Sequence, residues 1–199
     1  MKLKIILFLL ILSFSSNCQV FKKNAIYFVG RGTLSKKELI GDRFNQYNKQ
    51  LTHLGLGIVI NDTLMIYNVS SDKVINKSAL IVEKIPSFKN VNDIFYFGIW
   101  ELRCNKKTIN KIKKELITIQ KKQIYFDRKF VLSDDNYLYC SEFVYNITKN
   151  IKGFNSNPIS VELNKIEKQI LNVEKFSYIS VDYFLSNKNV KEFHTENLN

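Results

Sequence analysis

The sequence predicts an α+β fold in a single exported domain. Strand-like segments and helix-like segments are mixed along the chain without the strand–helix–strand order of a parallel α/β sheet. The chain has 199 residues, of which 45% are hydrophobic, with only 7 Gly and 2 Pro. It is therefore long enough to bury one core, and no change in composition marks a second domain.

The N-terminus has the order of a secretory signal peptide. Lys2 and Lys4 precede an apolar run over residues 5–12, and residues 13–18 are small and mostly polar. The run is shorter than the roughly 20 residues that span a bilayer. We therefore expect residues 1–18 to be removed, leaving a domain over residues 19–199 in the periplasm or cell envelope. Lipidation of Cys18 remains an open alternative.

The charge of the chain is strongly positive. A formal net charge of +12 suits anionic partners such as nucleic acid, phospholipid or acidic wall polymers. However, the lysines are scattered, and no basic run is interleaved with aromatic residues as a nucleic-acid groove requires. We expect a monomer with a solvated basic surface and no specific nucleic-acid site. Peripheral association with a membrane or wall stays open.

The first half of the chain is expected to consist mainly of strands. Four segments are rich in apolar and β-branched residues: Ala25 to Val29, Leu54 to Ile60, Thr63 to Val69 and Phe95 to Leu102. Asn61-Asp62 has turn chemistry and predicts a hairpin between the second and third segments. Residues 33–50 predict a loop or short helix, and residues 71–94 predict a second loop. Neither segment carries a readable motif.

The second half is expected to contain two main helices. Asn105 is the predicted N-cap of a helix to about Lys122, because isoleucines and a leucine recur at helical spacing. A second helix is predicted to begin near Cys140 and to end at Gly153. Four weaker expectations complete the pattern: an extended segment at 125–132, a turn at 133–136, a helix at 163–171 and a last strand at 178–184.

Two cysteines, Cys104 and Cys140, remain after cleavage. Because an exported chain can form disulfides, a bridge between them is an open alternative. Neither cysteine has the spacing of a metal site, and only His53 and His194 could complete one. We expect no metal and no cofactor, and we expect His194 to be inert in a polar C-terminal tail.

Cys140 is the candidate nucleophile. It opens the second predicted helix, where free amides and the positive end of the helix dipole favour an anion, so we expect a lowered thiol pKa. The same amides can donate to an oxyanion that forms on a carbonyl under attack. The alternative interpretation is a buried structural cysteine.

His53 is the candidate base. Strand alternation places it on one face with Gly55, Gly57 and Val59, while the leucines and isoleucines of the segment form the core face. The glycines offer little side-chain bulk, so another part of the chain is expected to approach closely there. The helix end that carries Cys140 fits this expectation. The alternative is a solvent-facing histidine.

Asn68 and Ser70 are the candidates for the group that orients the imidazole. If Asn61-Asp62 is a two-residue turn, Asn68 lies on the same face as His53 and diagonal to it, within about 7–8 Å. Ser70 then lies directly opposite His53. A three-residue turn would move Asn68 to the other face.

Several segments together resemble a known family. They are Ile124–Phe130, Asp134-Asp135 and Leu138–Val144 around the cysteine, His53-Leu54-Gly55-Leu56 and Met65–Asn68 around the histidine, and Ser180–Phe184 near the C-terminus. This pattern resembles the signature of the YiiX-like proteins, a circularly permuted branch of the NlpC-type papain-like cysteine hydrolases. The histidine motif precedes the cysteine motif in that branch, as it does here.

The resemblance implies a permuted papain-like fold, in which a small antiparallel, barrel-like sheet packs against the helix that carries the nucleophile. Cys140 and His53 would be its catalytic pair. The remaining matched positions imply supporting or substrate-binding roles: Tyr139, Ser141, Glu142, Asp127 and Gly55. We interpret Glu142 as a first-turn acid that complements the helix dipole.

The chain departs from the family pattern at four places. Lys23-Asn24-Ala25 stands where Gly-Asp is usual, Val181 stands where Pro is common, Gly57 adds a second glycine to the histidine strand, and Asn68 replaces the usual acid. An asparagine can accept a hydrogen bond from a ring N–H but carries no charge to stabilise an imidazolium. Reduced activity is therefore expected.

Three functional hypotheses follow. The first is an exported cysteine hydrolase that cleaves an amide in a cell-wall peptide or related substrate, through an acyl-enzyme on Cys140 with His53 as general base. The second is a lipid-directed acyltransferase or esterase with an apolar groove, for which the candidate lining residues are Tyr27, Phe28, Tyr125 and Phe126. The third is a non-catalytic binding protein that keeps the fold.

Overall fold

The structure, a computed structural model, describes residues 20–71, 78–130, 132, 136–154, 156–162, 165, 168 and 175–198. Its centre is a six-stranded antiparallel sheet in the order β10-β5-β1-β2-β3-β4. The strands are β1 (Ala25–Thr33), β2 (His53–Ile60), β3 (Thr63–Val69), β4 (Leu80–Glu83), β5 (Ile94–Arg103) and β10 (Val190–Asn197). The α+β class expected from the sequence is confirmed.

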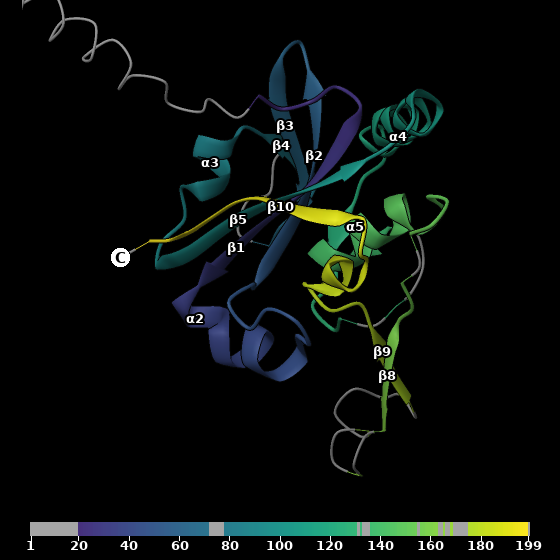
Figure 1. The fold of residues 1–199 in the computed structure, drawn as a ribbon. Coiled ribbons are helices and arrows are strands. Elements are labelled where there is room, and N and C mark those ends of the chain that lie inside the picture. The colour runs from purple at the N-terminus through teal and green to yellow at the C-terminus, as the bar shows by residue number, and fades with distance from the viewer. Residues whose placement is uncertain are drawn as a thin grey trace, which may run out of the picture.

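Helices cover both faces of the sheet (Figure 1). The short helix α3 (Ile85–Lys89) lies on one face, and α4 (Lys106–Ile119) and α5 (Cys140–Thr148) lie on the other. Between β1 and β2 the chain forms α2 (Leu34–Lys36) and a π-helix (Lys37–Asp42), and Tyr183–Ser186 forms a 3-10 turn. Two small pairs of strands lie outside the sheet: parallel β6 (Tyr125–Phe126) with β7 (Tyr137–Leu138), and antiparallel β8 (Ile159–Glu162) with β9 (Lys175–Tyr178).

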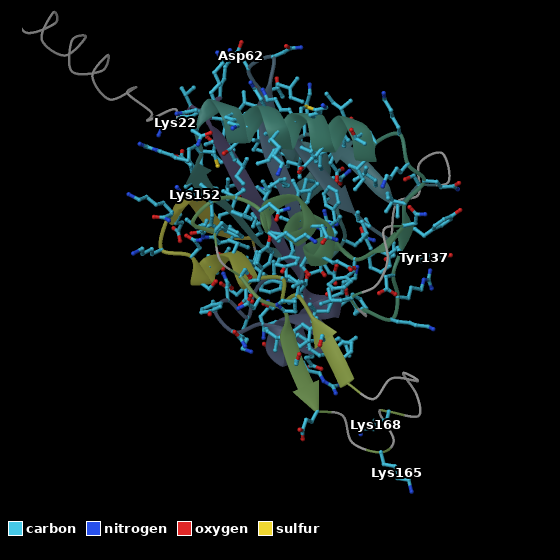
Figure 2. The ribbon with its side chains drawn as sticks, turned by 90° about the vertical axis from the view of Figure 1, so that its right-hand side faces the viewer. Lys22, Asp62, Tyr137, Lys152, Lys165 and Lys168 are labelled. Carbon is cyan, nitrogen blue, oxygen red and sulfur yellow. The ribbon has the colours of Figure 1, made fainter. Side chains whose placement is uncertain are left out.

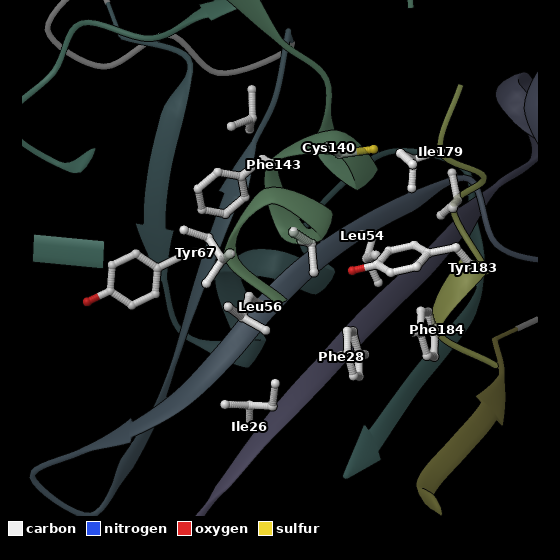
Figure 3. Close-up of a cluster of buried hydrophobic side chains, with 14 of the residues drawn as sticks. Ile26, Phe28, Leu54, Leu56, Tyr67, Cys140, Phe143, Ile179, Tyr183 and Phe184 are labelled. Carbon is white, nitrogen blue, oxygen red and sulfur yellow. The ribbon is translucent and has the colours of Figure 1, made fainter. Parts of the chain in front are cut away.

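Because both faces are covered, two hydrophobic clusters form. The larger cluster joins the sheet to α4 and α5 and includes Phe28, Leu54, Leu56, Phe143 and Phe184 (Figure 3). The smaller cluster lies under α3 and includes Tyr27, Val59, Ile66, Phe88 and Phe97. Alternation along the central strands β1, β2, β3 and β5 therefore sends successive side chains into two different cores rather than into core and solvent.

The β2–β3 hairpin has the predicted two-residue turn. Ile60 pairs with Thr63, and Asn61 and Asp62 both have positive φ values, of 46° and 59°. Asparagine and aspartate tolerate this left-handed backbone better than most residues, which explains their use at a tight hairpin. The register that follows from this turn fixes which side chains of β3 share a face with His53.

Both main helices begin where the sequence predicts. Asn105 caps α4, with its Oδ1 accepting a hydrogen bond from the Thr108 N–H at 2.8 Å. The buried side chains of α4 are Ile109, Ile112 and Leu116, as the helical spacing predicts. Helix α5 begins at Cys140, and the left-handed Gly153 (φ 79°) follows its end.

Several expectations about the remaining segments are wrong. Residues 71–94 are not a plain loop, since β4 and α3 lie within them. The last strand is not at 178–184: β9 ends at Tyr178 and the chain then turns, whereas β10 pairs with β5. In the extended segment expected at 125–132, the described residues form a strand only at Tyr125–Phe126.

Some expectations fall outside the described residues. These are the signal peptide with Cys18, the turn residues 133–135 and most of the helix expected at 163–171. Among the described residues, no helix is both long enough and apolar enough to cross a membrane.

Candidate active site

Cys140 is the first residue of α5, and its thiol lies against the beginning of β2. The backbone N–H groups of Leu54 and Ser141 are hydrogen-bond partners of the thiol. The first hydrogen bond of the helix runs from the Phe143 N–H to the Tyr139 C=O, so the amides before Phe143 have no partner within the helix. One N–H donor to the sulfur therefore comes from the helix start, at Ser141, as the sequence predicts, and the other comes from β2, at Leu54.

The pKa of the Cys140 thiol is nevertheless raised rather than lowered. Burial is the largest cause, because the residue is only 5% exposed and the thiolate is poorly solvated. The N–H groups of Leu54 and Ser141 and the charges of Lys36 and Arg31 act in the opposite direction but do not overcome burial. The lowered pKa expected from the helix terminus is thus wrong, and the resting group is a neutral thiol.

His53 is the first residue of β2 and is buried, with 7% of its surface exposed. Its Nε2 lies 3.0 Å from Oδ1 of Asn68. Nδ2 of Asn68 in turn donates to Oε1 of Glu83 at 3.0 Å. The strands β2, β3 and β4 therefore place an imidazole, an amide and a carboxylate in one hydrogen-bonded series, which we call the His53–Asn68–Glu83 chain.

The position of Asn68 agrees with the diagonal placement predicted from the hairpin. The Leu56–Tyr67 pair sets Gly55 opposite Asn68 in the register, so Asn68 reaches His53 across a residue without a side chain. A Cβ atom at Gly55 would lie 3.2 Å from the Cβ atom of Asn68 and 2.6 Å from Cγ2 of Ile66. Gly55 thus leaves room for the contact between the imidazole and the amide.

The expectation that α5 covers the glycine face of β2 is wrong. Cys140 belongs to the cluster that contains Leu54 and Leu56, which is the opposite face of the strand. On the glycine face the space is filled from neighbouring strands, and the imidazole lies beside the Phe88 ring, with 5.7 Å between ring centroids. Both faces are buried here, which alternation within one strand cannot reveal.

The thiol of Cys140 lies at the end of β2, beside the peptide bond that follows His53, rather than across the face of the strand. The β2–β3 pairing ends at Leu56–Tyr67, two residues after Leu54. The Leu54 N–H, which belongs to the peptide bond that follows His53, is the group that bonds the thiol of Cys140. Figure 3 shows the Cys140 sulfur at the tip of α5, above Leu54 and beside Ile179.

Comparison with known proteins finds no matching family model, no similar curated protein and no similar solved structure. Among the described residues, no group of three or more His, Cys, Asp or Glu side chains is arranged to hold a metal ion.

Arg31 is a site residue that the sequence did not reveal. It pairs with His53 in the β1–β2 register, is 3% exposed, and donates from Nη1 to the Phe88 C=O at 2.8 Å. Its guanidinium carbon also lies 4.5 Å from the centre of the Phe88 ring. A buried cation thus lies beside the base and helps to lower the pKa of the Cys140 thiol against the effect of burial.

Tyr139 and Ser141, which flank the nucleophile, both bind the backbone of Ile179. The Tyr139 hydroxyl accepts from the Ile179 N–H at 2.7 Å, and the Ser141 hydroxyl donates to the Ile179 C=O at 2.7 Å. Both residues are almost fully buried, at 3% and 1% exposed. Their role is therefore to hold the C-terminal segment against the helix start, not to touch a substrate.

Glu142 and Asp127 are also buried near this point. Both carboxylates raise the pKa of the Tyr139 hydroxyl, although burial of the hydroxyl is the main cause of that increase. Oδ1 of Asp127 accepts from the Lys129 N–H at 2.8 Å, and the Asp127 N–H donates to the Leu138 C=O. Asp127 therefore shapes the turn after β6, next to the segment that enters α5.

Asp182, in the C-terminal motif, holds the loop that precedes His53. Its buried Oδ2 accepts hydrogen bonds from the N–H groups of Tyr47 and Asn48, the latter at 2.8 Å. Oδ1 of Asn45 accepts from the Val181 N–H at 3.2 Å, which adds a second link. The C-terminal motif thus holds in place the loop that leads into β2.

Cys104 and Cys140 are both free thiols and lie far apart. The Cys104 N–H bonds to the Asn24 C=O just before β1, whereas the thiol of Cys140 lies at Leu54, which pairs with Gly30. Six residues of strand separate Asn24 from Gly30, or about 20 Å. A disulfide needs Cα atoms within about 7 Å, so the open alternative of a Cys104–Cys140 bridge does not hold.

Two further expectations are corrected. His194 is not in an irregular tail but lies in β10, with Nε2 3.4 Å from Oε1 of Glu196. Tyr27 and Phe28 are both fully buried, in different clusters on opposite faces of β1. They cannot line one groove. Tyr125, by contrast, is 40% exposed and stacks on Tyr137, with 5.1 Å between the ring centroids.

Proposed function

We propose that this chain is an exported cysteine hydrolase of the permuted papain-like type, with Cys140 as nucleophile and His53 as general base. One observation carries the proposal. The His53–Asn68–Glu83 chain lies on the strand whose Leu54 N–H bonds the Cys140 thiol. A nucleophile, a base and a group that orients the base are the parts that acyl transfer through a thiol requires.

The hydrogen bonds indicate which nitrogen of His53 is the base. A carboxylate only accepts hydrogen bonds, so Glu83 binds the N–H₂ end of Asn68 and leaves the amide oxygen toward His53. That oxygen also only accepts, so Nε2 must carry the proton of the neutral ring. The unprotonated nitrogen is then Nδ1, which lies on the main-chain side of the ring.

The proposed reaction begins with the neutral thiol. As the sulfur of Cys140 attacks a carbonyl carbon, its proton passes to Nδ1 of His53, and the carbonyl oxygen takes the negative charge. The intermediate collapses when His53 returns the proton to the leaving amine or alcohol, and a thioester remains on Cys140. Water activated by His53 then hydrolyses the thioester and restores the thiol.

The protein offers charge stabilisation at two points of this sequence. N–H groups at the start of α5, which have no partner within the helix, would donate to the oxyanion. The second point is the positive charge on His53 after it takes the proton. The imidazolium would donate to Oδ1 of Asn68, and Nδ2 of Asn68 donates to the carboxylate of Glu83. The charge that Asn68 lacks as the orienting group is thus supplied from β4.

The substrate class is proposed from context. An exported chain with a basic surface meets cell-wall peptides and phospholipids, and we favour a peptide amide. The hypothesis of a lipid substrate is weakened, because Tyr27 and Phe28 are buried and do not line an apolar groove. Lipid esters are the alternative substrate class, and the experiment below includes them for comparison.

The test is acylation of the protein by a small activated ester, followed by intact-mass measurement. Wild type is expected to gain one acyl group on Cys140 and to lose it on incubation. Cys140→Ala and His53→Ala are expected to abolish this burst. The chain offers matched controls, since Cys104→Ala and His194→Ala remove the same groups elsewhere and are expected to acylate normally.

The same measurement can also contradict the proposal. Retention of wild-type acylation in Cys140→Ala or His53→Ala, with folding confirmed by circular dichroism, would exclude these residues as the catalytic pair. If acylation follows the proposal, a panel of wall-peptide amides and phospholipid esters decides the substrate class. Release of amine supports the amide hydrolase, whereas release of fatty acid alone overturns that assignment.

A further inference from the structure

A cavity of about 290 Å³ lies at the opposite end of α5 from Cys140. Three segments form it: the end of β5 at residues 101–103, the loop after α5 at residues 151–154, and residues 188, 189 and 191 around the start of β10. Figure 2 shows Lys152, which lines this cavity, on the opposite side of the molecule from Tyr137. Tyr137 lies in β7, just before Cys140 in the chain. The cavity is thus separate from the proposed active site.

Positive charge dominates the lining of this cavity. The cations are Arg103, Lys152, Lys188 and Lys191, and the one carboxylate is Glu101. Glu101 is already neutralised, because Arg103 Nε lies 2.7 Å from its Oε1 and Lys22 Nζ lies 3.5 Å from its Oε2. Within the described part of the chain, the three lysines have no ion-pair partner.

The walls of the cavity are held together by hydrogen bonds. Asn187 Nδ2 donates to the Gly153 C=O at 3.1 Å, which ties the loop after α5 to the turn before β10. The side-chain oxygen of Asn187 accepts from the Asn189 N–H at 2.9 Å, and β10 then pairs with β5 through Val190 and Leu102. The three segments that carry the cations therefore form one fixed rim.

The floor and the mouth of the cavity differ in character. Leu102 and Phe154 are buried and apolar, whereas the lysines are exposed at the rim. Gly153 has a φ of 79°, and a Cβ atom built there would meet no atom within 4 Å, so the space beside it is open. An apolar floor below a ring of cations suits a ligand with an anionic head and a small organic part.

The cations repel one another unless an anion lies between them, and a phosphate group neutralises more of this charge than a carboxylate does. A phosphate also presents three acceptor oxygens, which lysine and arginine donors can share. The volume lies near the lower end of the roughly 300–1,000 Å³ typical of small-molecule sites. It therefore accommodates a phosphate with a short substituent but not a large polymer segment.

We propose that this cavity binds a phosphate group of a phosphomonoester or phosphodiester, at a site distinct from Cys140. The source is either a small soluble phosphate ester or the headgroup of an anionic phospholipid, which share this chemistry. The site does not depend on the proposed hydrolase activity, so either proposal can fail without the other.

The test uses the chain over residues 19–199, labelled with ¹⁵N and titrated with inorganic phosphate and with glycerol 3-phosphate. Saturable shifts are expected at the amides of Lys152, Gly153, Lys188 and Asn189. The triple variant Lys152→Gln/Lys188→Gln/Lys191→Gln is expected to weaken binding by about fivefold or more at low salt. The matched control Lys106→Gln/Lys107→Gln/Lys114→Gln removes the same charge from exposed positions on α4 and is expected to change binding by about twofold or less.

Equal weakening in both triple variants, or shifts that do not saturate or that lie elsewhere, would overturn the proposal in favour of diffuse surface attraction. A vesicle arm then distinguishes the sources. If the cavity variant alone loses cosedimentation with phosphatidylglycerol vesicles, a lipid headgroup is the ligand. If vesicle binding is unchanged and glycerol 3-phosphate binding is lost, the ligand is a soluble phosphate ester.

Discussion

Oε1 of Glu83 accepts a hydrogen bond from Nδ2 of Asn68 at 3.0 Å, and this contact decides which end of the Asn68 amide faces His53. An amide next to a histidine alone can adopt either orientation, because its two ends exchange donor and acceptor roles. Next to a carboxylate only one orientation avoids two acceptors facing each other. Glu83 therefore acts on the base without touching it, as a positioning residue.

Glu83→Gln is expected to lower the rate of acylation of Cys140 by about tenfold or more, which corresponds to about 1.4 kcal/mol in the barrier. The glutamine still offers an oxygen to Asn68, but it can also rotate and carries no charge to support the imidazolium. We expect kcat to fall while KM is unchanged, which separates positioning from substrate binding. Glu115→Gln on α4 is the control, and equal kinetics for the two variants would contradict the role of Glu83.

Asn68→Asp is expected to destabilise the fold by about 2–4 kcal/mol, because it places a second buried carboxylate against Glu83. Adding Glu83→Gln leaves a single carboxylate and is expected to recover more than half of the loss. Urea unfolding at pH 7 of wild type, both single variants and the double variant measures this coupling. Strict additivity of the two single effects would show that residues 68 and 83 do not interact.

Cys140 is expected to alkylate slowly at pH 7, because burial raises the pKa of its thiol and so lowers the thiolate fraction below that of an ordinary cysteine. The iodoacetamide rate should keep rising above pH 9 rather than level off near neutrality. The Cys104→Ser background removes the other thiol among the described residues, whose pKa burial raises to about 11. A rate that is already maximal at pH 6–7 would indicate a preformed thiolate and contradict the neutral resting state.

Asp182→Ala is expected to cost about 1–3 kcal/mol of stability, because the N–H groups of Tyr47 and Asn48 lose their buried acceptor. The loop before His53 should also become easier to cleave in limited proteolysis. The comparison variant is Asp42→Ala, which breaks only an exposed ion pair with Lys37 and should cost about 0.5 kcal/mol or less. If the loop is no more sensitive in Asp182→Ala than in Asp42→Ala, the C-terminal motif does not hold it.

Local chemistry in the sequence is sufficient for several elements of the fold. Asn61-Asp62 predicts the two-residue turn, Asn105 predicts the start of α4, and the apolar spacing predicts its buried face. In each case the signal lies within a few residues and one dominant interaction decides the outcome. The placement of Asn68 beside His53 also follows, because hairpin register depends only on the turn.

Other features depend on segments that are distant in the chain. The strand β4, which carries Glu83, lies between short segments without a clear hydrophobic periodicity. The strand β10 is too polar to be recognised as a strand from its sequence. The two-core arrangement also escaped prediction, since the His53 face of β2 is covered by Phe88 from α3 rather than by α5. A single strand pattern cannot say which element covers which face.

Local sequence patterns are enough to predict the elements that carry the candidate site: a cysteine at a helix start, a histidine at a strand start and an asparagine at the diagonal position of a hairpin. Three other features arise only when distant segments pack together: the contact of the thiol with the Leu54 N–H, the increase of the thiol pKa by burial, and the position of Glu83 behind Asn68. The difference lies in the distance along the chain over which each effect acts. Turns, caps and register are set by neighbouring residues, whereas solvation and charge at a site depend on everything that packs around it.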